Sequence, residues 1–350
     1  MAPKGKKKNP PVMSHEFIIQ NHADIVAVIA MVFMAGLMVE AFHPLASSFI
    51  AISHNVTYPE MGVNGNDLVL FRPGPKDLLA VFFYTLVMIL AHAIIQEFCL
   101  DKFNKKLHLS KVKFAKFNES GQLLAFYAFS FIFAANLVWE SAEKGYVKFF
   151  SSFWNGYPDE HVAMPWLHKL FYILQISYWV HVFPELYLCK TKKEDMPAKI
   201  QYASLYLISI ILGYVLHYQR VMMVLLALHY LVEGIFHMAK MLYLFDKTDL
   251  AQGGFRLWSL LFAGARFATV VITAITFWFG FGQVHAENPS TSTGIIPRVS
   301  SSVGICLLQA WMTWNFINFQ VKRSKDSSPA ETHQTKKSVK VANGTQKKKQ

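Results

Sequence analysis

The chain has 350 residues, of which 53% are hydrophobic and only 16% are charged. Its apolar residues form runs long enough to cross a bilayer, which excludes a soluble enzyme or binding domain and favours a protein with several membrane spans. The formal net charge is +12, but Lys and Arg lie in short clusters between the apolar runs, so nucleic-acid binding is not expected.

Eight apolar runs predict an all-α fold, a polytopic membrane helix bundle with about eight transmembrane helices. The first run lacks the short apolar core and the small-residue cleavage site of a removable signal peptide, so we expect it to stay in the protein as a membrane helix. The predicted spans are 25–46, 77–100, 122–139, 167–188, 201–218, 221–244, 257–281 and 302–319.

The basic residues predict the orientation of these spans, because short cytosolic loops collect Lys and Arg. If both termini are cytosolic, the cytosolic segments carry most of the 34 Lys and Arg residues. The same topology puts the sequon at Asn55 in the first lumenal loop, where we expect N-glycosylation, and the sequons at Asn118 and Asn343 in the cytosol. The last four residues, 347–350, match a dilysine retrieval signal and can equally be read as a solvated basic end.

The sixth predicted span carries His229, Glu233 and His237 at intervals of four residues, so the three side chains share one helix face. A carboxylate at mid-membrane depth is costly in lipid and has to face protein, water or a bound polar group. Arg266 lies at a matching depth in the seventh span, and we predict an interhelical contact between Glu233 and Arg266. Further polar side chains lie in the fourth span, at His181 and Glu185, and in the second, at His92, Gln96 and Glu97.

These side chains permit three interpretations. A metal site needs three or four converging ligands, but His229 and His237 lie about 12 Å apart along the helix axis and no HExxH box occurs, so no metal is predicted. The three cysteines offer neither a disulfide framework nor a Cys-x-x-Cys site. A histidine that acts as general acid or base on a lipid is the second interpretation. The favoured interpretation is a structural one, a buried polar cluster that lines the bundle interior or a hydrated or lipid-filled cavity and consists of His229, Glu233, His237, Arg266, His181 and Glu185.

Several short motifs resemble the translocating chain-associated membrane protein family over about residues 11–323. They are SHEF at 14–17, NHADI at 21–25, KFNESGQL at 116–123, FPELY at 183–187, KTKKED at 190–195 and INFQ at 317–320. The resemblance implies a multi-pass protein of the endoplasmic reticulum membrane that assists cotranslational translocation and membrane insertion. It also implies the partners: the Sec protein-conducting channel, nascent signal sequences and transmembrane segments, and membrane lipids, with the ribosome nearby.

The resemblance further implies a TLC domain over the later helices. The expected organisation is a cytosolic basic N-terminus at 1–23, two transmembrane helices with a glycosylated lumenal loop and a cytosolic basic loop at 24–116, a TLC domain of six transmembrane helices at 117–326, and a disordered Lys-rich cytosolic tail at 327–350.

The TLC domain also occurs in ceramide synthases, whose signature resembles a His-His pair before one span and His-Asp-x-x-Asp in the next. This chain has Gln201 and Tyr202 in place of the first pair and keeps only His229 and Glu233 of the second motif. The comparison therefore implies a protein without enzymatic activity, catalytic residues or cofactor. The alternatives are a TLC-type membrane lipid enzyme, acyltransferase-like, and a lipid-binding or lipid-sensing protein.

Overall fold

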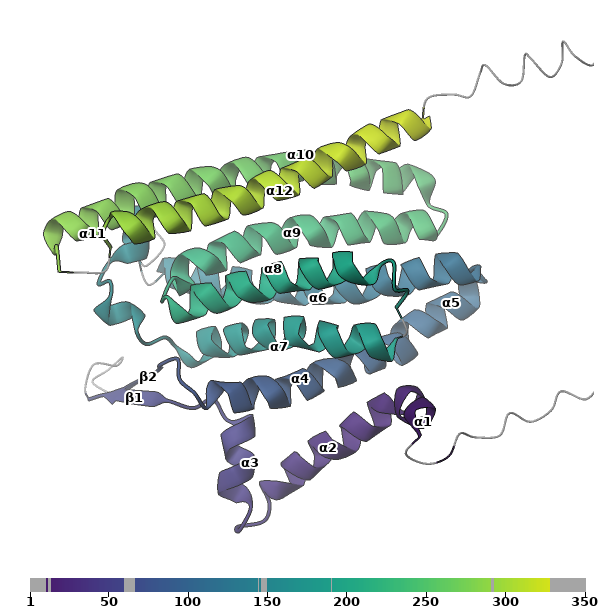
Figure 1. Cartoon of the computed structure of the whole chain (residues 1–350), viewed down its shortest axis with the longest axis horizontal. Coiled ribbons are helices and arrows are strands. Elements are labelled where there is room, and N and C mark those ends of the chain that lie inside the picture. Colours follow the sequence, from purple (N-terminus) through teal and green to yellow (C-terminus); the bar gives the residue numbers. More distant parts are fainter. Residues whose placement is uncertain are drawn as a thin grey trace, which may run out of the picture.

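The computed structural model describes residues 11, 14–59, 67–143, 145, 150–189, 191–290 and 293–327, and the side chains of 150, 151 and 323–327 are not described. The basic tract at 4–8, the tail with its dilysine sequence and the sequon at Asn343 lie outside the described residues. Within them, the predicted polytopic helical fold is confirmed: long helices run side by side, and the only sheet has two short strands (Figure 1).

The helices of the main bundle are connected so that successive ones run in opposite directions (Figure 1). They are α4 (Asp77–Ile94), which continues through η2 (Ile95–Leu100) into α5 (Asp101–Leu107), then α6 (Lys111–Glu143), α7 (Trp166–Leu188), α8 (Met196–Val215), α9 (Gln219–Leu244), α10 (Thr248–Thr273), which continues through η5 (Ala274–Gly280) into α11 (Phe281–Glu287), and α12 (Ile295–Ser327). Among the described residues, six of these helices are long and apolar enough to cross a membrane, and α7 lies among them with a less apolar sequence.

The lower hydropathy of α7 follows from its place in the interior. It packs between α4 and α8, and its polar residues Lys169, Gln175 and His181 are buried. Because neighbouring helices shield these side chains from lipid, α7 needs fewer apolar residues than a helix at the periphery.

The first predicted span, 25–46, is wrong as a single helix. The structure ends α2 (His22–Gly36) ten residues earlier, makes turns over the following residues, and begins α3 (His43–Ile50) with Pro44 in its first turn. Proline has no backbone N–H and clashes with the carbonyl four residues before it, so it starts a helix well and does not continue one. In Figure 1, α2 lies obliquely beside α4 with the short helix α1 (His15–Gln20) at one end and α3 at the other.

The segment predicted as a cytosolic basic loop is mostly helical. α5 and the first turns of α6 occupy it, and the expected domain boundary between residues 116 and 117 falls inside the continuous helix α6. The basic residues of this segment therefore project from helix ends, at the end of the bundle where α1 and the last residues of α12 also lie (Figure 1).

The opposite end of the bundle carries a β-hairpin that the sequence did not reveal. β1 (Asn55–Tyr58) pairs antiparallel with β2 (Leu68–Phe71), and Phe71 also bridges to Met164 just before α7. The Lys169 ammonium lies 2.7 Å from the Asp77 carboxylate and donates to the carbonyl oxygens of Ser53 and Arg72 at 2.9 and 2.6 Å. A buried charge pair with its remaining hydrogen-bonding capacity satisfied fixes the hairpin to α4 and α7.

α9 is the central helix and packs against α6 and α10. The largest core cluster is rich in aromatic rings and includes Phe126, Tyr127, Trp179 and Tyr230. α8 packs on α7 and α9, whereas α12 packs on α10 and η5. The two helices thus stand on either side of one face of α9.

Candidate functional site: a lateral cleft

Two adjoining cavities lie between α8 and α12 with α9 behind them, and together we call them the lateral cleft. The larger has a volume of about 680 Å³ and the smaller about 230 Å³, and Tyr202, Trp311 and Met312 line both. The walls of the larger cavity are mostly apolar residues of α8, α9 and α12, such as Leu212 and Leu308.

The lateral cleft extends over most of the depth of a membrane. Its lining on α12 begins at Ser300 in the larger cavity and ends at Phe319 in the smaller one. At about 1.5 Å per helical residue this stretch is about 28 Å long. The hydrocarbon core of a bilayer is about 30 Å thick, so the cleft matches the length of one membrane-spanning segment.

A buried guanidinium provides the strongest polar feature of the cleft. Arg266 on α10 donates to Nδ1 of His229 and to Oε1 of Gln309 on α12, both at 2.9 Å, and its guanidinium lies 5.0 Å from the centre of the Phe262 ring. Because arginine is only a donor, Nδ1 of His229 has to accept, and the imidazole is the neutral tautomer with its proton on Nε2.

Three tyrosine hydroxyls continue this network away from Arg266. Nε2 of His229 donates to the hydroxyl of Tyr206, which is 3.1 Å from that of Tyr202, which in turn is 2.9 Å from that of Tyr127. The chain of hydrogen bonds links α10, α9, α8 and α6 at mid-bundle. It satisfies His229 on both ring nitrogens, so neither nitrogen is free to take a proton from a substrate.

The predicted contact between Glu233 and Arg266 is not a direct one. Among the described residues no ion pair or hydrogen bond joins them. Arg266 instead donates to His229, which lies one turn before Glu233 on α9, and to Gln309 on α12. Glu233 is half-buried in the wall of the smaller cavity and acts on Arg266 electrostatically. His237 is buried, and its ring stacks on Tyr127 with centroids 5.7 Å apart.

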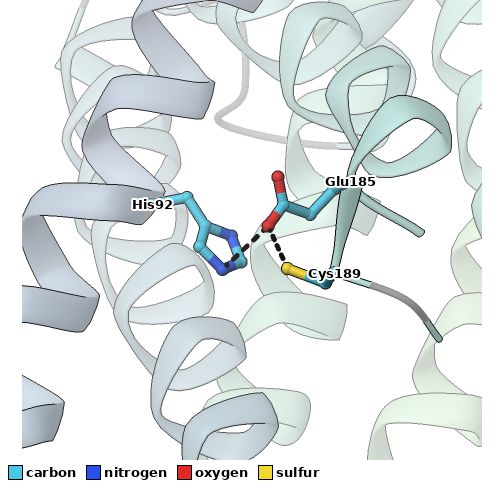
Figure 2. Close-up of side chains that lie close together, drawn as sticks. All are labelled: His92, Glu185 and Cys189. Atoms are coloured by element: carbon cyan, nitrogen blue, oxygen red, sulfur yellow. Dashed lines mark hydrogen bonds and ion pairs between the residues drawn. The ribbon is translucent and has the colours of Figure 1, made fainter. Parts of the chain in front are cut away.

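The remaining two members of the predicted polar cluster lie elsewhere. Glu185 contacts His92 of α4, with 3.3 Å between the carboxylate oxygen and Nε2, and also accepts from the thiol of Cys189 at 2.8 Å (Figure 2). His181 is buried beside them, with its ring centre 6.0 Å from that of His92. The structure thus divides the six predicted residues: His229, Glu233 and Arg266 line the lateral cleft, His237 packs behind it against Tyr127, and His181 and Glu185 lie where α4 meets the end of α7.

Sequence reasoning missed the hydrogen-bonding partners of the charged residues. Tyr206 and Gln309 read as ordinary residues of apolar helices, and no spacing rule relates them to Arg266 on a third helix. Gln201 and Tyr202, the positions that resemble the synthase His pair, do line the cleft together with His229. A phenol and an amide thus stand where a paired imidazole would be needed for proton transfer.

The helices, their apolar faces and the lateral cleft define a polytopic membrane protein of the TLC-domain class, and residues 116–318 match the TLC domain. Over 330 residues the chain is 36% identical to translocating chain-associated membrane protein 2 of Homo sapiens, covering 93% of this chain and 86% of that protein. The protein of the same name from Mus musculus shows the same identity and coverage. The chain belongs to the translocating chain-associated membrane protein family, as its motifs predicted.

Proposed function

We propose that this protein acts beside the Sec channel of the endoplasmic reticulum, and that its lateral cleft receives the apolar helix of a signal sequence or nascent transmembrane segment. The single observation that carries the proposal is the cleft, which opens between α8 and α12 and is as long as the hydrocarbon core is thick. The names of the relatives, which refer to translocating chains, agree with it.

The polar groups within the cleft suit an incoming segment that is only weakly hydrophobic. A uniformly apolar helix passes into lipid without help, whereas a segment with polar residues meets a barrier because lipid offers no hydrogen-bonding partners. Gln309, Tyr202 and Ser209 offer such partners inside the bilayer, and apolar residues of α8 and α12 cover the rest of the segment. The protein thereby lowers the barrier between the aqueous channel and lipid.

The cleft supports a receiving role better than an enzymatic one. Both ring nitrogens of His229 are engaged by Arg266 and Tyr206, and Glu233 lies in the neighbouring cavity. An acyl transfer needs a base with a free lone pair near the attacking hydroxyl or amine. The alternative of a TLC-type acyltransferase would require this network to open.

A photoreactive residue on α12 tests the proposal. Placed at Leu308, which lines the cleft, it should crosslink to a stalled nascent chain when a signal sequence or transmembrane segment has left the channel. Placed at Val303, which is exposed on the same helix outside the cleft, it should give at least about tenfold less product. Equal yields at the two positions, or strong crosslinks at Val303 alone, would rule out the cleft as the receiving site.

A bound lipid is the second candidate, because a mostly apolar cavity of about 680 Å³ with one buried guanidinium has the size and polarity of a site for a single anionic lipid. The same probe distinguishes the two. A lipid adduct at Leu308 that forms without any nascent chain, and that a nascent chain does not displace, would make the protein a lipid-binding protein. Displacement by the nascent chain would support the receiving role.

A further inference from the structure

Outside the lateral cleft, three metal-binding side chains converge where α4 meets the C-terminal end of α7. Nε2 of His92, a carboxylate oxygen of Glu185 and Sγ of Cys189 all lie within 4.8 Å of one another (Figure 2). His92 belongs to α4 and Glu185 to the last turn of α7, and Cys189 caps the C-terminus of α7 four residues after Glu185, so the side chains of Glu185 and Cys189 lie on the same side.

We propose that His92, Glu185 and Cys189 bind a zinc ion. One nitrogen, one oxygen and one sulfur donor suit Zn²⁺, which accepts all three types in a tetrahedral arrangement. Metal–ligand distances of about 2.0–2.3 Å put neighbouring donor atoms a little over 3 Å apart, and Nε2 of His92 lies 3.3 Å from Oε1 of Glu185. Three protein ligands leave the fourth position to water.

An unpartnered oxygen at the same place points independently to a cation. Oε2 of Glu185 is buried and has no hydrogen-bond partner among the described residues, while Oε1 is shared by His92 and Cys189. A buried carboxylate oxygen without a partner is costly, and a metal ion would satisfy it.

The charge of the site also fits a divalent ion near the membrane. Zn²⁺ together with the Glu185 carboxylate and the Cys189 thiolate forms a neutral unit, and His92 adds no charge as a ligand. A neutral unit avoids the desolvation cost that an isolated ion meets at this depth. Binding releases the thiol proton of Cys189, so the affinity rises with pH.

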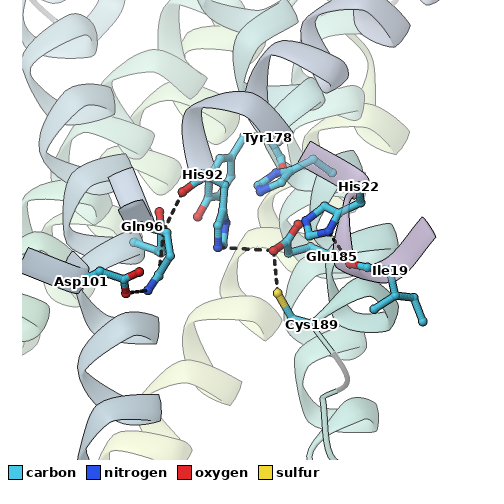
Figure 3. Close-up of polar contacts among 10 residues, drawn as sticks. Ile19, His22, His92, Gln96, Asp101, Tyr178, Glu185 and Cys189 are labelled. Carbon is cyan, nitrogen blue, oxygen red and sulfur yellow. Dashed lines mark hydrogen bonds and ion pairs between the residues drawn. The ribbon is translucent and has the colours of Figure 1, made fainter. Parts of the chain in front are cut away.

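The surroundings hold the ligands in place. The carbonyl oxygen of His92 accepts from Gln122 of α6 at 2.9 Å, and the π-helical turn η2 begins three residues after His92 (Figure 3). π-turns within α-helices frequently occur at functional sites. Near the end of α7, the ring of His15 of α1 packs edge-on against that of Tyr187 with 5.5 Å between ring centres, so the zinc site stands where the N-terminal helices meet the main bundle.

Metal titration of the purified full-length protein in nanodiscs tests this inference. After treatment with a chelator, the protein should bind one equivalent of Zn²⁺, and Co²⁺ in its place should give a thiolate-to-cobalt charge-transfer band. Cys189→Ser should abolish the band and weaken Zn²⁺ binding more than about tenfold, and Glu185→Gln should weaken it similarly. Cys99→Ser, in η2 beyond His92, and Cys306→Ser, on α12, change exposed cysteines that are not among the three ligands and should leave both readouts unchanged.

Thermal unfolding separates loss of metal from loss of fold. Without metal, Cys189→Ser should unfold at the temperature of the parent, because Cys189 is exposed at the end of α7. Zinc should raise the unfolding temperature of the parent and leave that of Cys189→Ser unchanged. A parent protein without a charge-transfer band, a band retained in Cys189→Ser, or the same loss in Cys99→Ser would overturn the zinc site.

Discussion

Arg266 is the charged residue around which the cleft network is built. It is 6% exposed, and its hydrogen-bond partners His229 and Gln309 are neutral. The charge is therefore stabilised by dipoles, by the Phe262 ring and by the more distant Glu233 carboxylate, without a direct ion pair. Because its hydrogen-bond partners are neutral, the guanidinium can still attract a polar or anionic group that enters the cleft.

Replacement of this residue should destabilise the bundle measurably. Arg266→Gln leaves the acceptor atoms of His229 and Gln309 without their donor, at a cost of about 1–3 kcal/mol for each unpaired group. We expect a lower thermal unfolding temperature in detergent and less protein in membranes. Arg256→Gln, at an exposed position on the same helix, is the control and should behave as the parent. Equal stability of the two variants would contradict this account of Arg266.

At the scale of helices and strands, the elements that could be predicted are those that depend on a local pattern of apolar residues in the sequence. Six of the predicted spans lie within helices of the structure, and a seventh, 201–218, runs three residues past the end of α8, because long apolar runs reflect a membrane environment directly. Pro44, in the first turn of α3, is a local signal of the break between α2 and α3, but it lies eight residues after Gly36, where α2 ends in a mostly apolar run. The hairpin depends on pairing between strands of four residues, too short for a reliable alternation of polar and apolar positions.

The same distinction between local pattern and tertiary packing applies to the residues of the two sites. Residues that are unusual for a membrane helix, such as Arg266 and Glu233, could be singled out from the sequence. Their partners could not, because contacts between different helices depend on tertiary packing. Glu185 illustrates this limit: nothing in the sequence relates it to His92 of α4, with which the structure pairs it.

The segment between α6 and α7 is fixed to the start of α9 by a buried histidine. The ring nitrogens of His161 lie 3.3 and 3.2 Å from the carbonyl oxygens of His217 and Asn155, of which the neutral ring donates to one, and its own carbonyl accepts from Gln219. Burial, reinforced by the nearby Arg220, lowers the pKa of His161 from 6.5 to about 3. The folded protein thus keeps this ring neutral at pH values where the unfolded chain is protonated.

This segment should loosen in mild acid. As pH falls below about 6.5, the unfolded state takes up a proton at His161 that the folded state does not accept until about pH 3, so stability is lost progressively over this window, by at most about 1.4 kcal/mol per pH unit. The unfolding temperature of the parent should fall between pH 7.5 and 5, and more steeply than that of His161→Phe. His43→Phe, at an exposed histidine, should keep the slope of the parent. An unchanged slope in His161→Phe would contradict the assignment.

At the scale of the whole molecule, the two ends of the bundle differ in their connecting segments and in their residue types. One end carries α5 and the α7–α8 and α9–α10 connections, and the other carries the hairpin and α11 (Figure 1). Most Lys and Arg residues of the described helices lie toward the first end, and the aromatic cluster around Trp154 and Phe281 lies next to α11 at the second. From the positive-inside rule we predict that the basic end faces the cytosol. The lateral cleft runs from Ser300 at the hairpin end toward Phe319 at the basic end. On this prediction, Ser300 would be on the lumenal side and Phe319 on the cytosolic side.

Glycosylation at Asn55 tests this orientation. Asn55 and Thr57 alternate with Val56 along β1, so both side chains of the sequon point to the same face of the hairpin, and both are exposed. If the hairpin lies in the lumen, the protein should carry a glycan that endoglycosidase removes, and Asn55→Gln and Thr57→Ala should each abolish the mobility shift. Asn118→Gln should change nothing, because Asn118 lies in α6 at the basic end of the bundle. A glycan that persists in Asn55→Gln and disappears in Asn118→Gln would reverse the bundle in the membrane, and with it the direction in which a nascent segment meets the cleft.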